Sequence, residues 1–391
     1  MKHWLMIGAL ALAGCAATQS TRAPQTGPVR ISAANSDQLR QVGAAILFWT
    51  QAQRDTNFPA METVFPGNVI KAGRKVRPMP AGAPLTLAAG EVDAFMAAQN
   101  VAGLIVLQDG KVRLERYARG LTAQGRWTSF SVAKSFTATL VGAAIKDGYI
   151  KSVDEPVTRY IPELVGSGYD GVSIAQLLTM TSGVKWNEDY TSPTSDVARM
   201  YATPVPVGTD PTVAYMRTLP RESAPGAKWV YKTGETNLIG VLVTKATKQP
   251  LATYLSEKIW KPYGMQADGF WMIDQSGQEI GGCCLSVSLR DYARIGQLAL
   301  DGGAGLVPAG WFAEATAAKA PFARPGFGYG YQWWTYPDNR YGAQGIFGQS
   351  VMVDPTRRIV IAIVSAWPKA TDRQFTVDRA AFQEKLIAAA D

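Results

Sequence analysis

Histidine is almost absent from this sequence of 391 residues: the one histidine is His3, close to the amino terminus. We interpret the first residues as a cleaved export signal, which would leave the mature chain without histidine. That count excludes catalytic triads of serine, histidine and aspartate, and it excludes cysteine–histidine pairs. The sequence also lacks a Gly-x-Ser-x-Gly segment, the turn that presents the nucleophile of many hydrolases. A covalent hydrolase of this composition needs another base, and lysine and tyrosine are the main alternatives.

Long apolar runs are also scarce. Lys2 and His3 precede an apolar stretch at residues 4–12, whereas a permanent membrane helix needs about 20 residues. Residues 12–15, Leu-Ala-Gly-Cys, resemble the bacterial lipobox, whose cysteine is acylated and becomes the new amino terminus. We therefore predict a lipoprotein signal peptide at 1–15, a flexible tether at 16–36, and a periplasmic protein held at a membrane only by a lipid on Cys15. An ordinary signal peptide cut near Ala17 is the alternative.

Cysteine is rare, with three in the whole chain. Besides Cys15 there are only Cys283 and Cys284, which are neighbours. An exported protein meets an oxidising compartment, but adjacent Cα atoms lie about 3.8 Å apart, closer than most disulfides allow. We expect two small, buried, unpaired side chains. No cysteine–histidine cluster has metal-ligand spacing, so we predict neither a metal nor a cofactor.

Charge and composition indicate a soluble basic protein. Lys and Arg number 39 against 31 Asp and Glu, which gives a net charge of +8. The sequence has no run of five or more basic residues, so we predict no nucleic-acid partner. Hydrophobic residues make up 47% of the chain, enough for a large core. We predict one folded domain over residues 37–391; its oligomeric state cannot be read from the sequence.

The order of predicted elements indicates an α+β fold. Strands are predicted at 104–107 and 112–117 near the start, and at 329–334, 348–353 and 359–366 near the end. Helices are predicted at 37–53, 91–99, 131–147, from Ser288 onward, and at 373–390. The middle of the chain carries short helical patterns. This arrangement predicts an antiparallel sheet flanked by helices, with a helical lobe inserted within about 150–285.

Ser131 and Lys134 form a Ser-x-x-Lys pattern at the start of an apolar helix. Residues three apart share a helix face, so the lysine amine can reach the serine hydroxyl. The positive end of the helix dipole favours an anionic oxygen there. The lysine pKa, ordinarily about 10.4, must fall before the amine can act as a base. Taken alone, the pattern is a weak signal, because it occurs by chance in many proteins as a helix cap followed by a snorkelling lysine.

Four segments together resemble the serine β-lactamase and penicillin-binding superfamily. Residues 127–135, Trp-Thr-Ser-Phe-Ser-Val-Ala-Lys-Ser, resemble its first motif. Residues 176–183, Gln-Leu-Leu-Thr-Met-Thr-Ser-Gly, resemble a second conserved segment of that superfamily. Residues 231–237 begin with Tyr-Lys-Thr where class C enzymes have Tyr-x-Asn or Tyr-x-Ser. Residues 343–349 fall where β-lactamases carry Lys-Thr-Gly, but the basic residue is missing and Arg340 is the nearest cation. The combination is most similar to the 6-aminohexanoate-dimer hydrolase branch, over about residues 45–390.

The resemblance implies a covalent mechanism with named roles. Ser131 is the nucleophile, and Lys134 and Tyr231 move the protons. The backbone N–H groups of Ser131 and Ile346 form the oxyanion hole.

The resemblance also implies that Thr233 and Gly345 line the substrate site. Tyr190, on a loop like the one that covers substrate in the nylon-oligomer hydrolases, is a further substrate contact, although an ordinary surface aromatic fits the loop as well.

Three functions follow as hypotheses. The first is hydrolysis of small amide or ester substrates through an acyl-enzyme. The second is a β-lactamase or D,D-peptidase, which the missing Lys-Thr-Gly disfavours because that cation usually meets the substrate carboxylate. The third is a non-catalytic binding lipoprotein, which has no need of an intact serine, lysine and tyrosine.

Overall fold

The computed structural model describes residues 37, 40, 43 and 45–390. The predicted signal peptide with Cys15, and the predicted tether at 16–36, lie outside the described residues. Within the described part of the chain, no helix has both the length and the apolar character that a membrane crossing requires.

The larger of two sheets joins strands from both ends of the chain. Its eight strands pair antiparallel throughout, so the predicted antiparallel sheet is confirmed. The chain returns at its end to place β12 beside β2, with Ile361 opposite Val106. In spatial order the strands are β3 (Lys111–Tyr117), β2 (Val101–Gln108), β12 (Ile359–Ser365), β11 (Gln349–Asp354), β10 (Tyr341–Gly345), β9 (Trp334–Thr335), β8 (Gly328–Tyr329) and β7 (Ala320–Pro321).

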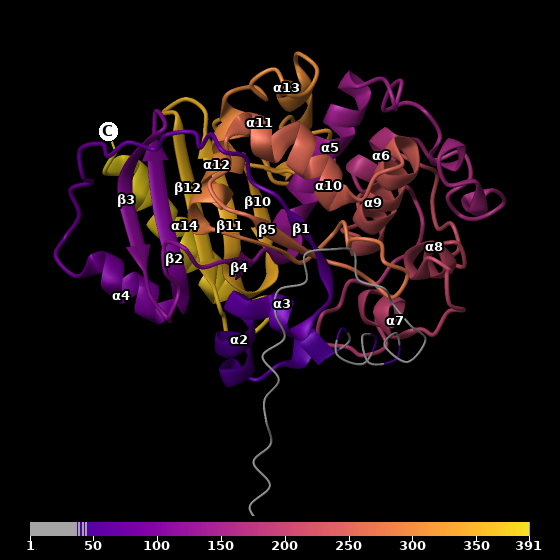
Figure 1. Ribbon diagram of the computed structural model, residues 1–391, viewed down its shortest axis with the longest axis horizontal. Coiled ribbons are helices and arrows are strands. Elements are labelled where there is room, and N and C mark those ends of the chain that lie inside the picture. The colour runs from indigo at the N-terminus through magenta and orange to yellow at the C-terminus, as the bar shows by residue number, and fades with distance from the viewer. Residues whose placement is uncertain (1–36, 38–39, 41–42, 44, 391) are drawn as a thin grey trace, which may run out of the picture.

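Helices cover both faces of this sheet (Figure 1). On one face lie α4 (Glu91–Ala98) and α14 (Arg373–Ala388), whose Phe95 and Phe382 rings stack with centroids 3.9 Å apart. On the other face α12 (Leu289–Leu300) packs against β2, β11 and β12. As predicted, α12 is capped by Ser288, whose hydroxyl accepts a hydrogen bond from the backbone N–H of Asp291.

A smaller sheet and a group of helices complete the fold. The sheet has the order β1 (Gly67–Ile70), β5 (Gly269–Met272), β6 (Leu285–Val287) and β4 (Trp127–Thr128). Between β4 and β5 come α5 (Ala133–Lys146), α6 (Ile174–Leu178), α7 (Asp196–Ala202), α8 (Pro211–Met216), α9 (Thr233–Thr247), α10 (Leu251–Leu255) and α11 (Lys261–Tyr263). Figure 1 shows α6 to α9 on the opposite side of the molecule from α4 and α14. The remaining short helices are α2 (Gln51–Asn57), α3 (Met61–Val64) and α13 (Trp311–Ala315).

Three predicted elements differ in detail from the structure. The helix expected over 37–53 is interrupted, because a 3-10 turn at Ile46–Phe48 precedes α2 and Thr50 caps α2 anew through a capping box. The strand expected at 329–334 is a hairpin of β8 and β9, turned at Gln332, which has a φ of +62°. The helix expected from residue 131 begins as a 3-10 turn, η3 (Phe130–Val132), and becomes α5 at residue 133.

Candidate active site

Ser131 lies in η3, the turn that leads into α5. The preceding residue, Phe130, has a φ of +42°, a conformation that bulky residues seldom adopt and that surrounding structure must hold. The Phe130 ring packs against Phe58 and Phe347 at centroid distances of 5.0 and 5.2 Å. This aromatic packing stabilises the turn, which presents the serine hydroxyl to a pocket.

Lys134 lies one turn further on, buried, with its amine enclosed by three oxygen atoms. Its Nζ is 3.1 Å from Ser131 Oγ, 3.1 Å from Thr233 Oγ1 and 2.8 Å from the carbonyl oxygen of Gly282. Burial lowers the pKa of Lys134 to about 7, against the raising effect of Glu188. A neutral amine has two N–H donors and one lone pair. With the donors on Gly282 and Thr233, the lone pair is directed at the Ser131 hydroxyl, the geometry of a general base.

Glu188 is a site residue to which the sequence analysis gave no role. Its carboxylate accepts the backbone N–H of Thr233 at 2.9 Å, and also the Thr233 hydroxyl and the Trp186 indole N–H. Because Thr233 is the first residue of α9, Glu188 also meets the positive end of that helix. The Thr233 hydroxyl thus connects the Lys134 amine to the Glu188 carboxylate.

Tyr231 is held by an aromatic cluster beside Lys134. Its ring stacks on Trp334 with centroids 5.6 Å apart and is edge-on to Tyr329. Lys134 Nζ lies 5.2 Å from the centroid of the same ring. Burial raises the pKa of Tyr231 above its ordinary value; the nearby Ser131 hydroxyl opposes this rise and Glu188 adds to it. The phenol is therefore protonated at neutral pH and suits the role of proton donor.

The two middle motifs meet beneath the site. Ser182, from the second motif, donates to Glu235, and Lys232 pairs with the same carboxylate at 3.4 Å. All three side chains are fully buried. Met180 accepts the backbone N–H of Lys232 through its sulfur at 3.4 Å and that of Val230 through its carbonyl. The second motif therefore acts as a support that fixes the segment carrying Tyr231.

The end of β10 lies directly against the nucleophile. A Cβ atom at Gly345 would approach Ser129 O to 2.5 Å and Ser131 N to 3.1 Å, so only glycine permits this distance. Ile346 follows and lines the same pocket as Ser131. This places both predicted oxyanion-hole residues together.

Among the described residues that line the pocket, none is a cation that could take the place of the missing lysine of the Lys-Thr-Gly pattern. Arg340 is turned toward Asp354 at 3.0 Å and Glu384 at 2.6 Å.

Tyr190 also lies in the pocket, and its hydroxyl donates to Glu188 at 2.8 Å. Burial raises the pKa of Tyr190 well above its ordinary value, and the Glu188 charge adds to the rise. The structure thus brings together every site residue named from the sequence within the folded domain, and Cys15 alone lies outside the described residues.

The two adjacent cysteines are the clearest correction to the sequence analysis. Cys283 and Cys284 form a disulfide, whereas we expected unpaired thiols, and Cys283 is only partly buried. The backbone there is tightly held: Gly282 N–H donates to Asn237 Oδ1 at 2.8 Å, and a Cβ atom on Gly281 would meet the carbonyl of Thr236 at 2.7 Å. The disulfide therefore directly follows Gly282, whose carbonyl oxygen contacts the Lys134 amine.

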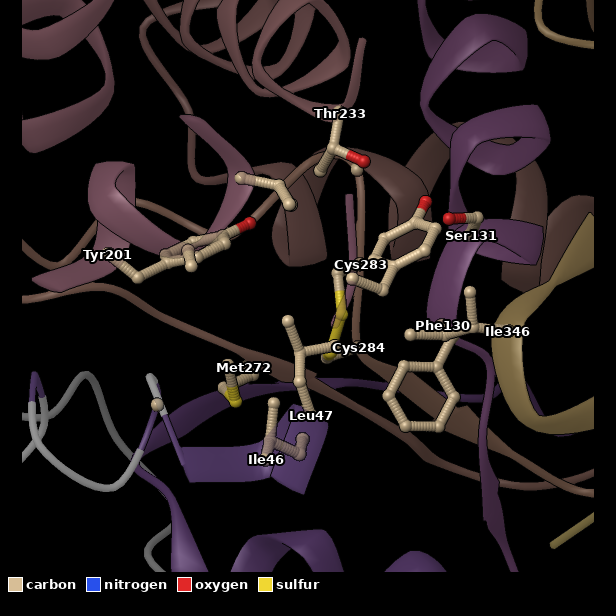
Figure 2. A pocket seen from close by; sticks show the side chains of 15 residues that line it. Ile46, Leu47, Phe130, Ser131, Tyr201, Thr233, Met272, Cys283, Cys284 and Ile346 are labelled. Atoms are coloured by element: carbon tan, nitrogen blue, oxygen red, sulfur yellow. A yellow bond between two sulfur atoms is a disulfide. The ribbon is translucent and has the colours of Figure 1, made fainter. Parts of the chain in front are cut away.

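Figure 2 shows the pocket in front of the nucleophile. The hydroxyl groups of Ser131 and Thr233 lie on one side, and Leu47, Met272 and the disulfide face them. The disulfide and Met272 come from around the smaller sheet, and Leu47 comes from the segment before α2. No sequence signal predicted this wall. Glu188 could have been predicted as a site residue, because it lies two residues before Tyr190 on the loop that resembles a substrate-covering loop.

Comparison with known proteins agrees with this fold. The family model described as Beta-lactamase matches residues 88–385. The 6-aminohexanoate-dimer hydrolase of Paenarthrobacter ureafaciens is 32% identical over 291 residues, which cover 69% of this chain and 74% of that protein.

Solved structures show the same fold. A Bacillus anthracis protein with the provisional name 6-aminohexanoate-dimer hydrolase superposes with a TM-score of 0.69 at 19% identity, covering 85% of this chain and 94% of its own. EstCE1, described as a hydrolase with promiscuous acyltransferase activity, gives 0.62 at 13% identity, covering 77% and 98%.

The fold and the site together define the class of hydrolases of the β-lactamase superfamily. Within it, the chain belongs to the Beta-lactamase family and is similar to the 6-aminohexanoate-dimer hydrolases.

Proposed function

We propose that the protein is a serine hydrolase that cleaves amide or ester bonds of small substrates through an acyl-enzyme on Ser131. The observation that carries the proposal is the buried Lys134 amine, 3.1 Å from Ser131 Oγ and with a pKa lowered to about 7. A lysine that is neutral near physiological pH and directed at a serine hydroxyl is an activated nucleophile pair. A non-catalytic binding protein has no reason to bury this amine.

The first chemical step forms the acyl-enzyme. Lys134 takes the Ser131 proton as the oxygen attacks the carbonyl carbon, and the new oxyanion lies toward the N–H groups of Ser131 and Ile346. The tetrahedral intermediate collapses by breaking the bond to the leaving alcohol or amine. Tyr231 gives that group its proton and recovers one from the Lys134 ammonium. Water then attacks the ester on Ser131, with the same two side chains taking and returning the proton, and the free acid leaves.

The surroundings of Ser131 favour a neutral ester or amide over a β-lactam. Ala343 stands where β-lactamases carry lysine, and Arg340 is paired elsewhere. No charged side chain is among the described residues that line the pocket. The carboxylate of a β-lactam or of a D,D-peptide would therefore lack an ionic partner.

Covalent labelling tests the proposal. A fluorophosphonate probe should add once to the purified protein, with the adduct at Ser131 by peptide mass spectrometry, and Ser131→Ala should give no adduct and no turnover. The substrates are a p-nitrophenyl ester, a linear amide dimer and a chromogenic cephalosporin, assayed on one preparation. A label at another residue, or full turnover by Ser131→Ala, would contradict the acyl-enzyme. Preference for the cephalosporin would make the protein a β-lactamase.

A further inference from the structure

The pocket in front of Ser131 is apolar on the side away from the hydroxyl groups. Ile46, Leu47, Ala198 and Met272 line it together with the Cys283–Cys284 disulfide. These residues come from four separate segments of the chain, and Ile46, Ala198 and Met272 are all less than a tenth exposed. A carbonyl carbon bound at Ser131 can therefore extend one of its substituents toward the hydrocarbon side chains of Leu47 and Met272 and the sulfur atoms of the disulfide (Figure 2).

Charged groups near this pocket already have partners. Lys134 and Glu188 are joined through Thr233 and lie behind the hydroxyl side. Beyond Met272 lies a second hollow, which is lined by Arg40 and Asp274.

Both of these outer groups are also engaged. Arg40 is paired with Asp37 at 2.8 Å. Asp274 accepts the backbone N–H groups of Ser276 at 2.7 Å and Gln278 at 3.2 Å. None of the described residues that line the pocket in front of Ser131 is charged. A charged substrate group there would lose its hydration without gaining an ionic partner, which is unfavourable.

The free space in the pocket is small. The centre of a water-sized group can occupy about 60 Å³ of it. A short aliphatic chain suits this space better than a bulky group.

We propose that the acyl part of the substrate is a short, uncharged aliphatic chain, bound with its tail along Leu47, Ala198 and Met272. This inference rests on the proposed acyl-enzyme at Ser131 and names its substrate class. The chain carries neither an ammonium nor a carboxylate at its far end, unlike the linear oligomer of an amino acid. Burial of its methylene groups supplies the binding energy.

Three p-nitrophenyl esters with six-carbon acyl chains test the charge requirement: hexanoate, 6-aminohexanoate and the adipate monoester. We expect kcat/KM for the hexanoate ester to exceed kcat/KM for each charged ester by at least ten-fold. It should also exceed kcat/KM for the p-nitrophenyl dodecanoate ester by a similar factor. Equal or faster turnover of either charged ester would overturn the inference while leaving the acyl-enzyme intact. Failure of the proposed function looks different: no ester is turned over and no fluorophosphonate adduct forms at Ser131.

Two pairs of variants test the wall itself. Leu47→Asp places a carboxylate in the pocket and should lower the ratio of kcat/KM for hexanoate to kcat/KM for 6-aminohexanoate at least ten-fold. Phe48→Asp is the control and should not change this ratio, because Phe48 is half exposed and lies outside the pocket. Ala198→Trp should raise the acetate to hexanoate ratio of kcat/KM at least ten-fold, because the indole occupies the space of the longer chain. Ala202→Trp, exposed on the same helix, should leave that ratio unchanged. An unchanged ratio in Leu47→Asp, with the fluorophosphonate rate preserved to show a folded site, would refute the assignment of this wall. An unchanged acetate to hexanoate ratio in Ala198→Trp, again with the fluorophosphonate rate preserved, would also refute it.

Discussion

Glu188 accepts two hydrogen bonds from Thr233, one from the backbone N–H at 2.9 Å and one from the hydroxyl. The same hydroxyl lies 3.1 Å from the amine of Lys134. The carboxylate therefore influences the base through one intervening side chain. Its negative charge raises the pKa of Lys134 while burial lowers it, so the two opposing effects set the pH at which the base becomes active.

Replacing Glu188 by Gln should move the acidic limb of the pH profile of kcat/KM to lower pH. Without the carboxylate charge, burial alone acts on the ammonium form of Lys134, and its pKa falls further. Ester hydrolysis from pH 4.5 to 9 measures the shift. Asp189→Asn, a neighbouring exposed carboxylate on the same loop, should leave the limb in place. A shift to higher pH would mean that Glu188 does not act on Lys134 through its charge.

The native protein should lose activity below about pH 7. The pKa of Lys134 is lowered to about 7, so the neutral amine is present above that pH and is lost as the pH falls through it. We expect kcat/KM to decline about ten-fold per pH unit on the acidic side and to be level above it. Lys134→Arg should be inactive at every pH, because a guanidinium does not deprotonate in proteins. A level profile from pH 5 to 9 would exclude Lys134 as the base.

The oxyanion hole is tested at Ile346. Ile346→Pro removes the backbone N–H and should lower kcat by about 100- to 1,000-fold, the usual loss for one donor. Ile346→Val keeps the backbone N–H and a similar side chain, so its kcat should stay within about three-fold of the native kcat. Circular dichroism and the melting temperature show whether the proline variant is folded. Unchanged kcat in a folded proline variant would remove Ile346 from the mechanism.

Tyr190 should matter more for amides than for esters. An amide nitrogen must be protonated before it leaves, whereas a p-nitrophenolate needs no proton. Tyr190→Phe should lower amide hydrolysis about ten-fold or more, equivalent to about 1.4 kcal/mol, and leave ester hydrolysis within about two-fold. Equal losses on both substrates would indicate a structural role through the hydrogen bond to Glu188.

The proposed lipid anchor is tested outside the folded domain. Cys15→Ser should move the exported protein from the membrane fraction to the soluble fraction with unchanged specific activity. Mass spectrometry of the native amino terminus should show a diacyl modification on Cys15. A native protein that is wholly soluble after export would contradict lipidation and favour an ordinary signal peptide.

Local patterns in the sequence determined much of this fold and part of the site. The pairing of Ser131 with Lys134 follows from the period of a helix, and the Ser288 cap follows from local hydrogen bonding. Alternating and apolar runs predicted β2, β3, β11 and β12, because strand character depends on nearby residues. These features need no knowledge of distant contacts.

Tertiary structure alone decided how the base is tuned and what the pocket accepts. Thr233 and Gly282, about 100 and 150 residues further on, enclose the Lys134 amine, and this burial lowers its pKa. The apolar wall brings Leu47 and Met272 to the same pocket. Contacts at such separations depend on how whole elements pack, and they leave no periodic signal in the chain. The pKa of a buried amine and the polarity of a pocket arise from this packing.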